Sequence, residues 1–151
     1  MWCFDQANGQ EFERDMKLIL FLVFLLGAAS AQAQVAVIAN GSVHESSLTQ
    51  EQFIDVCLQN VRAWSDGTSI QLFFSKNSGP EEDRLFAFLH RTRLEMRKIW
   101  LRAQLSGHVR PPEVMPSVED VLRKVESTPG ALGVVDVVKV QGNVKVLLVI
   151  E

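Results

Sequence analysis

The sequence predicts an α/β domain in which a mixed β-sheet is covered by helices. Segments that suit strands alternate along the chain with segments that have the apolar spacing of amphipathic helices. In the strand predicted at residues 69–75, the alternation of apolar and polar side chains is broken at Phe73, so both faces carry apolar groups. A strand that is covered on both faces belongs to a sheet between helical layers.

The N-terminus carries the pattern of a cleavable signal peptide at residues 16–33. Lys17 precedes an apolar run at residues 18–26, and small residues follow up to an Ala-x-Ala motif that ends at Ala33. The run is too short for an ordinary transmembrane helix. An uncleaved membrane anchor is the alternative interpretation.

Residues 1–15 do not fit this targeting signal. They are acidic, whereas a signal peptide opens with positive charge, and the Met-Lys pair at residues 16–17 makes a normal opening. We therefore interpret residues 1–15 as a mis-called extension of the gene. The expected mature protein is one domain of residues 34–151, located in the periplasm.

Charge and cysteine content argue against two classes of function. The formal net charge is −3 at pH 7, so no basic surface indicates a nucleic-acid partner. Cys57 is the only cysteine that remains after removal of the signal peptide, because Cys3 precedes it. It lies in an apolar helical pattern, which favours a buried, inert thiol over a nucleophile.

The first half of the domain is predicted to run from strand to helix to strand. A short apolar strand at residues 34–39 leads into turn residues, and a helix follows at residues 48–60. A capping box at residues 49–52 marks the start of that helix. An Asp-Gly turn at residues 66–67 then feeds the central strand at residues 69–75.

The second half is predicted to continue with helices and to end in two strands. Ser-Gly and Pro-Pro pairs separate the helices, and a Gln-Gly-Asn turn suits a hairpin. The expected elements are two helices with a break near Thr92 that end near Leu105, an irregular loop at residues 108–116, a helix at residues 117–128, and hairpin strands at residues 133–140 and 143–150.

The candidate binding site lies where the central strand turns into the next helix. Ser78 is a good helix N-cap, Gly79 permits an unusual dihedral, and Pro80 suits a first helical turn. Free backbone N–H groups at such a helix start bind phosphate or sulfate. The same residues also suit a simple helix cap, and acidic residues 81–83 already supply negative partners for the helix dipole.

Four short motifs support a more specific interpretation. Residues 54–60 and 64–68 read IDVCLQN and WSDGT, the pieces W, SG and PP follow, and residues 129–134 read PGALGV. In this order they resemble segments of the substrate-binding proteins of phosphate ABC transporters. The resemblance implies a periplasmic-binding-protein-like fold, whose full members have two lobes that close on a ligand. The 118 residues from 34 to 151 have room for a single lobe, and they resemble the second one.

The resemblance also implies a set of ligand residues. In the family, a GSGT turn preceded by an arginine grips phosphate. This chain has Asn77, Ser78, Gly79 and Pro80 at the turn, so it loses the threonine hydroxyl and one N–H donor to proline. Lys76 is the cation nearest to the place of the arginine, and it offers a point charge rather than a bidentate fork. The implied phosphate ligands are Lys76, Asn77, Ser78 and Gly79.

The resemblance implies a secreted domain that binds phosphate or a similar oxyanion for uptake or sensing. The expected partners are a membrane transporter, a receptor or a porin, and a homodimer would provide a second lobe. The alternative is a non-catalytic interaction module of the periplasm that keeps the lobe fold without ligand binding. Pro80, the acidic first turn and the absent first lobe motivate that alternative.

Enzymatic, metal-binding and cofactor-dependent functions are not indicated. The three histidines are far apart in the sequence and lack metal-ligand spacing. Asp136 follows a predicted strand, where an acid either lines a cleft or caps a turn. Trp64 and Trp100 suit core or partner-facing anchors better than a sugar-stacking platform.

Overall fold

The computed structural model describes residues 34–76, 79–107 and 110–151 of the chain. The predicted signal peptide and the predicted extension before it lie outside the described residues, as do Asn77 and Ser78 of the candidate binding turn. None of the helices in the described ranges is long and apolar enough to cross a membrane.

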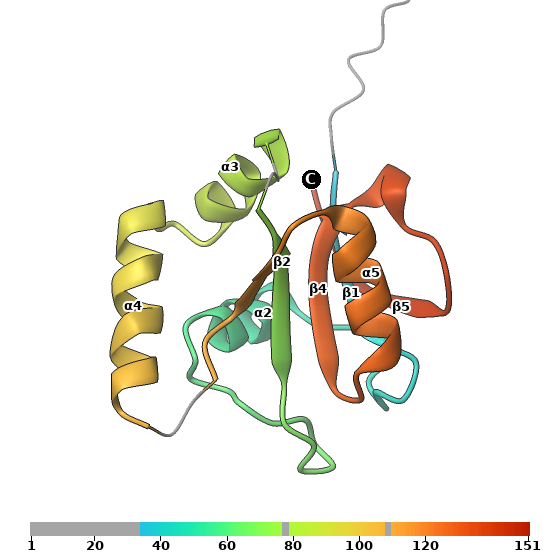
Figure 1. Cartoon of the computed structure of the whole chain (residues 1–151), viewed down its shortest axis with the longest axis horizontal. Helices are drawn as coiled ribbons and strands as arrows, with labels where there is room; N and C mark the ends of the chain where they lie inside the picture. Colours follow the sequence, from blue (N-terminus) through green and yellow to red (C-terminus); the bar gives the residue numbers. More distant parts are fainter. Residues whose placement is uncertain (1–33, 77–78, 108–109) are drawn as a thin grey trace, which may run out of the picture. The chain divides into compact units, whose positions relative to one another are not determined.

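The strands of the described residues form one mixed sheet. They are β1 (Val35–Asn40), β2 (Gln71–Ser75), β3 (Glu113–Met115), β4 (Ala131–Asp136) and β5 (Val144–Ile150). Their order in the sheet is β3-β2-β4-β1-β5 (Figure 1). Strand β2 runs parallel to β3 and β4, whereas β1 runs antiparallel to β4 and β5. The sheet is therefore mixed, as the sequence predicts.

The two C-terminal strands do not form the predicted hairpin. Strand β1 lies between them, so that Val37 pairs with Val134 on one side and with Leu148 on the other. The chain leaves β4 at Asp136 and continues through a short 3-10 helix, η1 (Val137–Lys139), before β5. The hairpin prediction is wrong because the sequence pattern does not identify the partner of a strand. Valine-rich strands joined by a Gly-containing turn occur both in hairpins and where a third strand lies between the two.

Part of the predicted loop at residues 108–116 is a strand. Val114 of β3 lies beside Phe74 of β2 in a parallel ladder. The prolines at residues 111–112 favour a loop in the sequence, but they end just before a strand at the edge of the sheet. Proline has no N–H group to donate, and at the edge of a sheet this costs no ladder hydrogen bond.

The helices begin close to their predicted positions. They are α2 (Gln50–Cys57), α3 (Gly79–Phe88), α4 (Arg93–Leu105) and α5 (Val118–Ser127). The predicted capping box at Thr49 and Gln52 starts α2, and a second one at Thr92 and Glu95 starts α4. Helix α2 ends earlier than expected, since Gln59 adopts a positive φ of 64° and cannot continue a right-handed helix.

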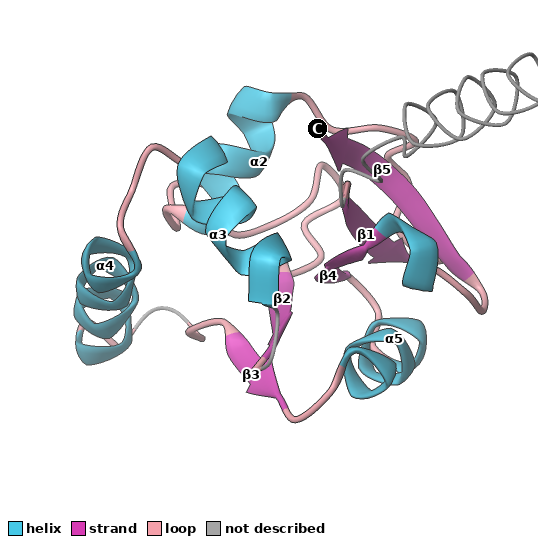
Figure 2. Cartoon of the chain, turned by 90° about the horizontal axis from the view of Figure 1, so that it is seen from above, coloured by secondary structure: helices cyan, strands magenta, loops and turns pink. Residues whose placement is uncertain are grey.

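Helices cover both faces of the sheet (Figure 2), with α2 and α3 on one face and α5 on the other. Val35 and Val37 of β1 belong to the core under α2 and α3. Their neighbours Ala36 and Ile38 belong to the core under α5. Phe73 is completely buried and packs in the α5 core, so the prediction that both faces of β2 are covered is confirmed.

Candidate functional site

A cavity of about 480 Å³ lies at the carboxyl edge of the three parallel strands. Ser75 and Asp136, which end β2 and β4, line it, and β3 contributes Val114. Helix α3 follows β2 and lies above the strand ends, while α4 stands beside it (Figure 1). In open α/β sheets, ligands bind outside the carboxyl ends of the strands. The cavity is therefore the candidate binding site.

Aromatic side chains form one wall of this cavity. The rings of Phe74 and Trp100 stack with their centroids 5.4 Å apart and an interplanar angle of 23°. The indole N–H of Trp100 donates a 2.9 Å hydrogen bond to the backbone carbonyl of Cys57, which fixes the orientation of the ring. Leu85, Phe86 and valines from β3, β4 and α5 complete the apolar part of the lining.

Two arginines of α4 supply most of the positive charge. Arg93 Nη2 lies 2.9 Å from Glu82 Oε2, and its guanidinium carbon lies 5.7 Å from the ring centroid of Phe86. Arg97 also lines the cavity, and within the described residues no ion pair involves it. Because Glu82 already neutralises Arg93, Arg97 is the arginine whose charge is available to a ligand.

The sequence-predicted ligand residues are only partly placed by the structure. Lys76 is exposed, lines the cavity, and its backbone N–H donates a 2.8 Å hydrogen bond to the carbonyl of Met115. Gly79 is the first residue of α3 and has a φ of 30°, a conformation that favours glycine. Asn77 and Ser78 lie outside the described residues, so their roles stay predictions.

Sequence reasoning missed the arginines of the cavity. The ligand residues that the resemblance implies include neither Arg93 nor Arg97, which both line the cavity. Glu95, which lies between them on α4, takes part in the helix cap, because its Oε2 accepts hydrogen bonds from the N–H and hydroxyl of Thr92, at 2.8 and 2.9 Å. The spacing of Arg93, Arg97 and Trp100 is the signal that could have found the site, since residues four and seven apart share one helix face.

Asp136 combines the two roles that the sequence left open. Its carboxylate Oδ1 accepts a 3.1 Å hydrogen bond from the N–H of Val138 and so caps η1. The residue also lines the cavity, at the end of β4. Its negative charge faces the same space as Lys76 and Arg97, so the cavity carries both signs of charge.

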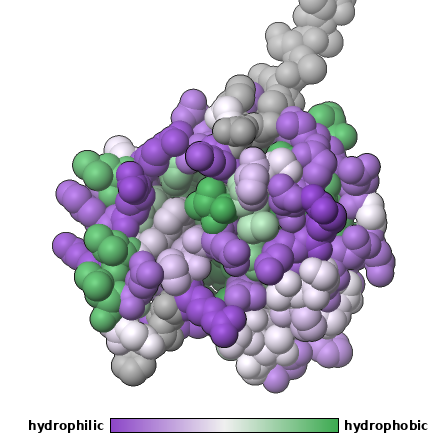
Figure 3. All heavy atoms as spheres, in the orientation of Figure 1, coloured by the Kyte–Doolittle hydropathy of each residue, from purple (hydrophilic) through white to green (hydrophobic). Residues whose placement is uncertain are grey.

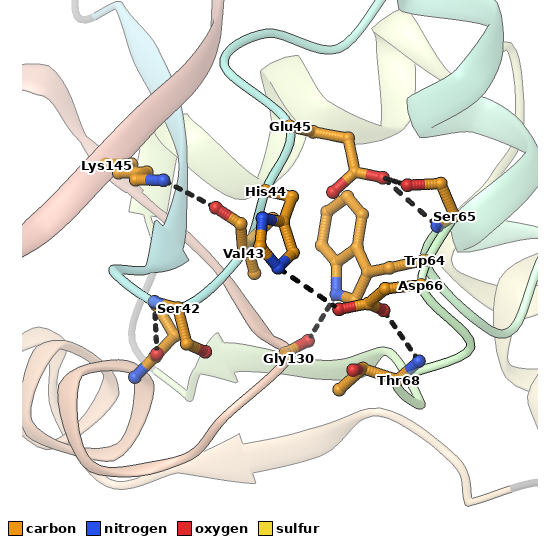
Figure 4. Close-up of polar contacts among 11 residues, drawn as sticks. Ser42, Val43, His44, Glu45, Trp64, Ser65, Asp66, Thr68, Gly130 and Lys145 are labelled. Carbon is orange, nitrogen blue, oxygen red and sulfur yellow. Dashed lines mark hydrogen bonds and ion pairs between the residues drawn. The ribbon is translucent and has the colours of Figure 1, made fainter.

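The motif at residues 64–68 precedes β2 and so lies near the amino ends of the parallel strands, away from the cavity at their carboxyl ends. Figure 4 shows its side chains. The indole N–H of Trp64 donates a buried 2.9 Å hydrogen bond to the carbonyl of Gly130, which precedes β4. Asp66 Oδ1 accepts from the N–H of Thr68 at 2.8 Å and closes the turn. This family-like motif therefore builds the scaffold and does not reach the cavity.

Polar groups around that turn also have structural partners. Glu45 Oε1 accepts hydrogen bonds from the hydroxyl and N–H of Ser65, at 2.6 and 3.1 Å, and these bonds lower the pKa of Glu45. His44 Nε2 lies 3.9 Å from Asp66 Oδ2 on the exposed surface (Figure 4). Within the described part of the chain, no group of three or more His, Cys, Asp or Glu side chains could hold a metal ion.

Cys57 is buried and free, as the sequence predicts. Burial strongly raises the pKa of its thiol, because a thiolate would lose its hydration in the core. The thiol is therefore protonated and inert. The contribution of Cys57 is its backbone carbonyl, which accepts the hydrogen bond from the indole N–H of Trp100.

The solved structures with a similar fold include phosphate-transport proteins. A protein of Clostridium perfringens described as a phosphate ABC transporter substrate-binding protein, solved with bound phosphate, superposes with a TM-score of 0.61 and 13% identity. An ABC-type phosphate transport receptor of Vibrio cholerae gives 0.59 and 16%, and PstS of Borrelia burgdorferi gives 0.54 and 16%. Each match covers 76% of this chain.

The match covers one part of those larger proteins. The shares of their chains that are covered are 45%, 46% and 47%, so this chain spans less than half their length. The fold is thus that of a single periplasmic-binding-protein-like lobe, as the sequence resemblance implies. The sequence matches no family model and no curated protein.

Proposed function

We propose that this domain binds phosphate or a similar oxyanion where β2 ends and α3 begins, and that it serves uptake or sensing without catalysis. The observation that carries the proposal is that Lys76, which directly follows β2, lines the cavity, while Gly79 begins α3 three residues later. The neighbours with this fold include a protein solved with bound phosphate, which supports the choice of ligand.

The proposed ligands act through backbone and side-chain donors. The N–H groups that open α3 have no partners within the helix, and they carry the positive end of its dipole. The side chains of Asn77 and Ser78 would add neutral donors, and Lys76 would add a charge. Pro80 contributes no N–H donor.

The ion pair of Glu82 explains how an anion can approach an acidic helix start. Glu82 is held by Arg93 at 2.9 Å, so part of the negative charge in the first turn of α3 is already compensated. Asp83 stays exposed and opposes an anion. We therefore expect an affinity below that of a site closed by two lobes.

The proposed setting is the periplasm, with secretion through the predicted signal peptide. A membrane transporter is the partner that the phosphate-transport neighbours favour. A receptor, a porin and a second copy of the chain are the other proposed partners.

Calorimetry of the purified protein with phosphate, with sulfate as the competing oxyanion, tests the proposal. Lys76→Gln should weaken phosphate binding about three- to tenfold. An ion pair between exposed side chains contributes about 1 kcal/mol or less, and a charge-assisted hydrogen bond to a bound anion contributes somewhat more. Ser78→Ala should weaken it as well. Lys98→Gln is the matched control, since Lys98 is exposed on α4 and does not line the cavity. Unchanged affinity in both Lys76→Gln and Ser78→Ala would refute the site.

A second function is favoured by an apolar stripe on α4. Leu94, Leu101 and Leu105 share one helix face and are 62%, 55% and 78% exposed. Figure 3 shows apolar side chains gathered over α4, on the left flank of the molecule. Exposed apolar patches of this kind mark contact surfaces. The stripe supports the interaction module, which has kept the lobe fold for a protein partner.

A pull-down from periplasmic and membrane extracts separates this function from the first. The expected result is a partner that is recovered by the wild-type domain and lost with Leu101→Gln together with Leu105→Gln. Arg102→Gln, between them on the same helix, is the control variant. Recovery of nothing, in a protein that binds phosphate, would leave only the first function.

A further inference from the structure

The cavity is much larger than an inorganic oxyanion. Its volume of about 480 Å³ lies within the range of about 300–1,000 Å³ that is typical of small-molecule sites. A tetrahedral oxyanion at the edge of α3 would leave most of this space to water against apolar walls, and the replacement of that water by an apolar group is favourable.

The aromatic wall suits a planar apolar group. Phe74 is buried and stacks on Trp100, which is half-buried and held in place by its hydrogen bond to Cys57. The indole N–H is thus already satisfied, so the ring offers only its apolar surface to the cavity. An aromatic ligand gains from such a wall both by burial and by ring stacking.

Arg97 supplies a cation one helical turn from Trp100. It lies three residues before Trp100 on α4, and both side chains line the cavity. A guanidinium group is weakly hydrated and presents a planar fork to carboxylate or phosphate. Arg93, one turn earlier, is engaged by Glu82. A ligand that stacks on Trp100 therefore meets one available arginine.

We propose that the cavity binds an organic anion with a planar apolar body, with the body against Phe74 and Trp100 and the anionic group on Arg97 and Lys76. The inference rests on the proposed oxyanion-binding function only in the phosphate group of the probe that tests it. The two sites share Lys76, but the inference also needs Trp100 and Arg97, which the oxyanion proposal does not use, so the two proposals fail separately.

Calorimetry with three probes tests the inference on the purified protein. The probes are phenyl phosphate, inorganic phosphate and phenol. Phenyl phosphate should bind at least about tenfold more tightly than either of the others, because burial of a ring adds apolar stabilisation to the charge contact. Val114→Phe, at an exposed position of the cavity rim, should narrow the cavity and reduce the advantage of phenyl phosphate over phosphate. An unchanged thermal midpoint shows that this variant is folded.

Arginine variants assign the anionic contact. Arg97→Gln should weaken phenyl phosphate binding at least about fivefold, since it removes a charge-assisted contact. Arg102→Gln is the matched control, because Arg102 is exposed on the same helix and does not line the cavity; its affinity should stay within about twofold of wild type.

The outcomes separate the two proposals. If phosphate binds as tightly as phenyl phosphate, the inference is overturned and the proposed oxyanion function survives. If phenyl phosphate binds and phosphate does not, the inference stands and the oxyanion site at the start of α3 falls. If phenol binds as tightly as phenyl phosphate, or if none of the three binds, the inference is wrong.

Discussion

The indole N–H of Trp64 donates its hydrogen bond to the carbonyl oxygen of Gly130, across a sequence separation of 66 residues. The two residues belong to two of the motifs that resemble phosphate-transport binding proteins. The bond joins the chain just before β2 to the chain just before β4, and these strands are neighbours in the sheet. The two motifs thus help to hold the parallel strands β2 and β4 side by side.

Trp64→Phe should destabilise the domain by about 1 kcal/mol, because the carbonyl of Gly130 loses a buried hydrogen bond and keeps only the longer one, 3.4 Å, from the N–H of Gln71. Urea denaturation followed by circular dichroism measures the loss. Trp100→Phe is the matched control: it removes the same N–H from a part-buried bond to Cys57 and should cost less. A Trp64→Phe variant as stable as wild type would show that water replaces the indole.

Gly130→Ala should destabilise the domain by about 2–5 kcal/mol, through left-handed backbone strain and overpacking. The φ of Gly130 is 74°, and an added Cβ would lie 2.5 Å from the carbonyl oxygen of Ser69. Gly107→Ala provides the comparison, since Gly107 has a φ of 72° with nothing within 4 Å of the added Cβ. Gly107→Ala should therefore cost only about 1–2 kcal/mol. Equal losses would mean that the backbone near Ser69 moves aside freely.

Stability should fall in acid partly through Glu45. The hydroxyl and N–H of Ser65 hold the pKa of Glu45 below its ordinary value of 4.5. The carboxylate therefore stabilises the folded state above that value, and the contribution is lost as the pH falls through the lower, folded-state pKa. Thermal midpoints of Glu45→Gln should fall less steeply than those of wild type below pH 4.5.

Cys57 should resist thiol reagents in the folded protein. Its side chain has no exposed surface, and burial raises the pKa of the thiol, so the reactive thiolate is absent. In a variant with Cys3→Ser, a disulfide reagent should label Cys57 in urea and not in buffer. Rapid labelling in buffer would indicate that α2 opens locally.

Local chemistry made most elements of this fold predictable. Helix caps such as Thr49 and Ser117 and the turn at Asp66 are short-range signals, and the structure confirms each of them. The position of β1 between β4 and β5 was not predictable in the same way, because partner choice depends on contacts between distant residues. The cavity shows the same limit: Lys76 and Gly79 followed from a motif, whereas Arg97 acquires its place only when α4 packs beside Phe74.

The position of β1 between β4 and β5 also affects how the domain can fold. Its residues are completely buried from Val35 to Ala39, yet their ladder partners lie roughly a hundred residues later in the chain. Such long-range pairing has a large loop-closure entropy and slows folding. A growing polypeptide therefore has no ladder partner for β1 until β4 has been synthesised, and β1 is paired on both sides only once β5 follows.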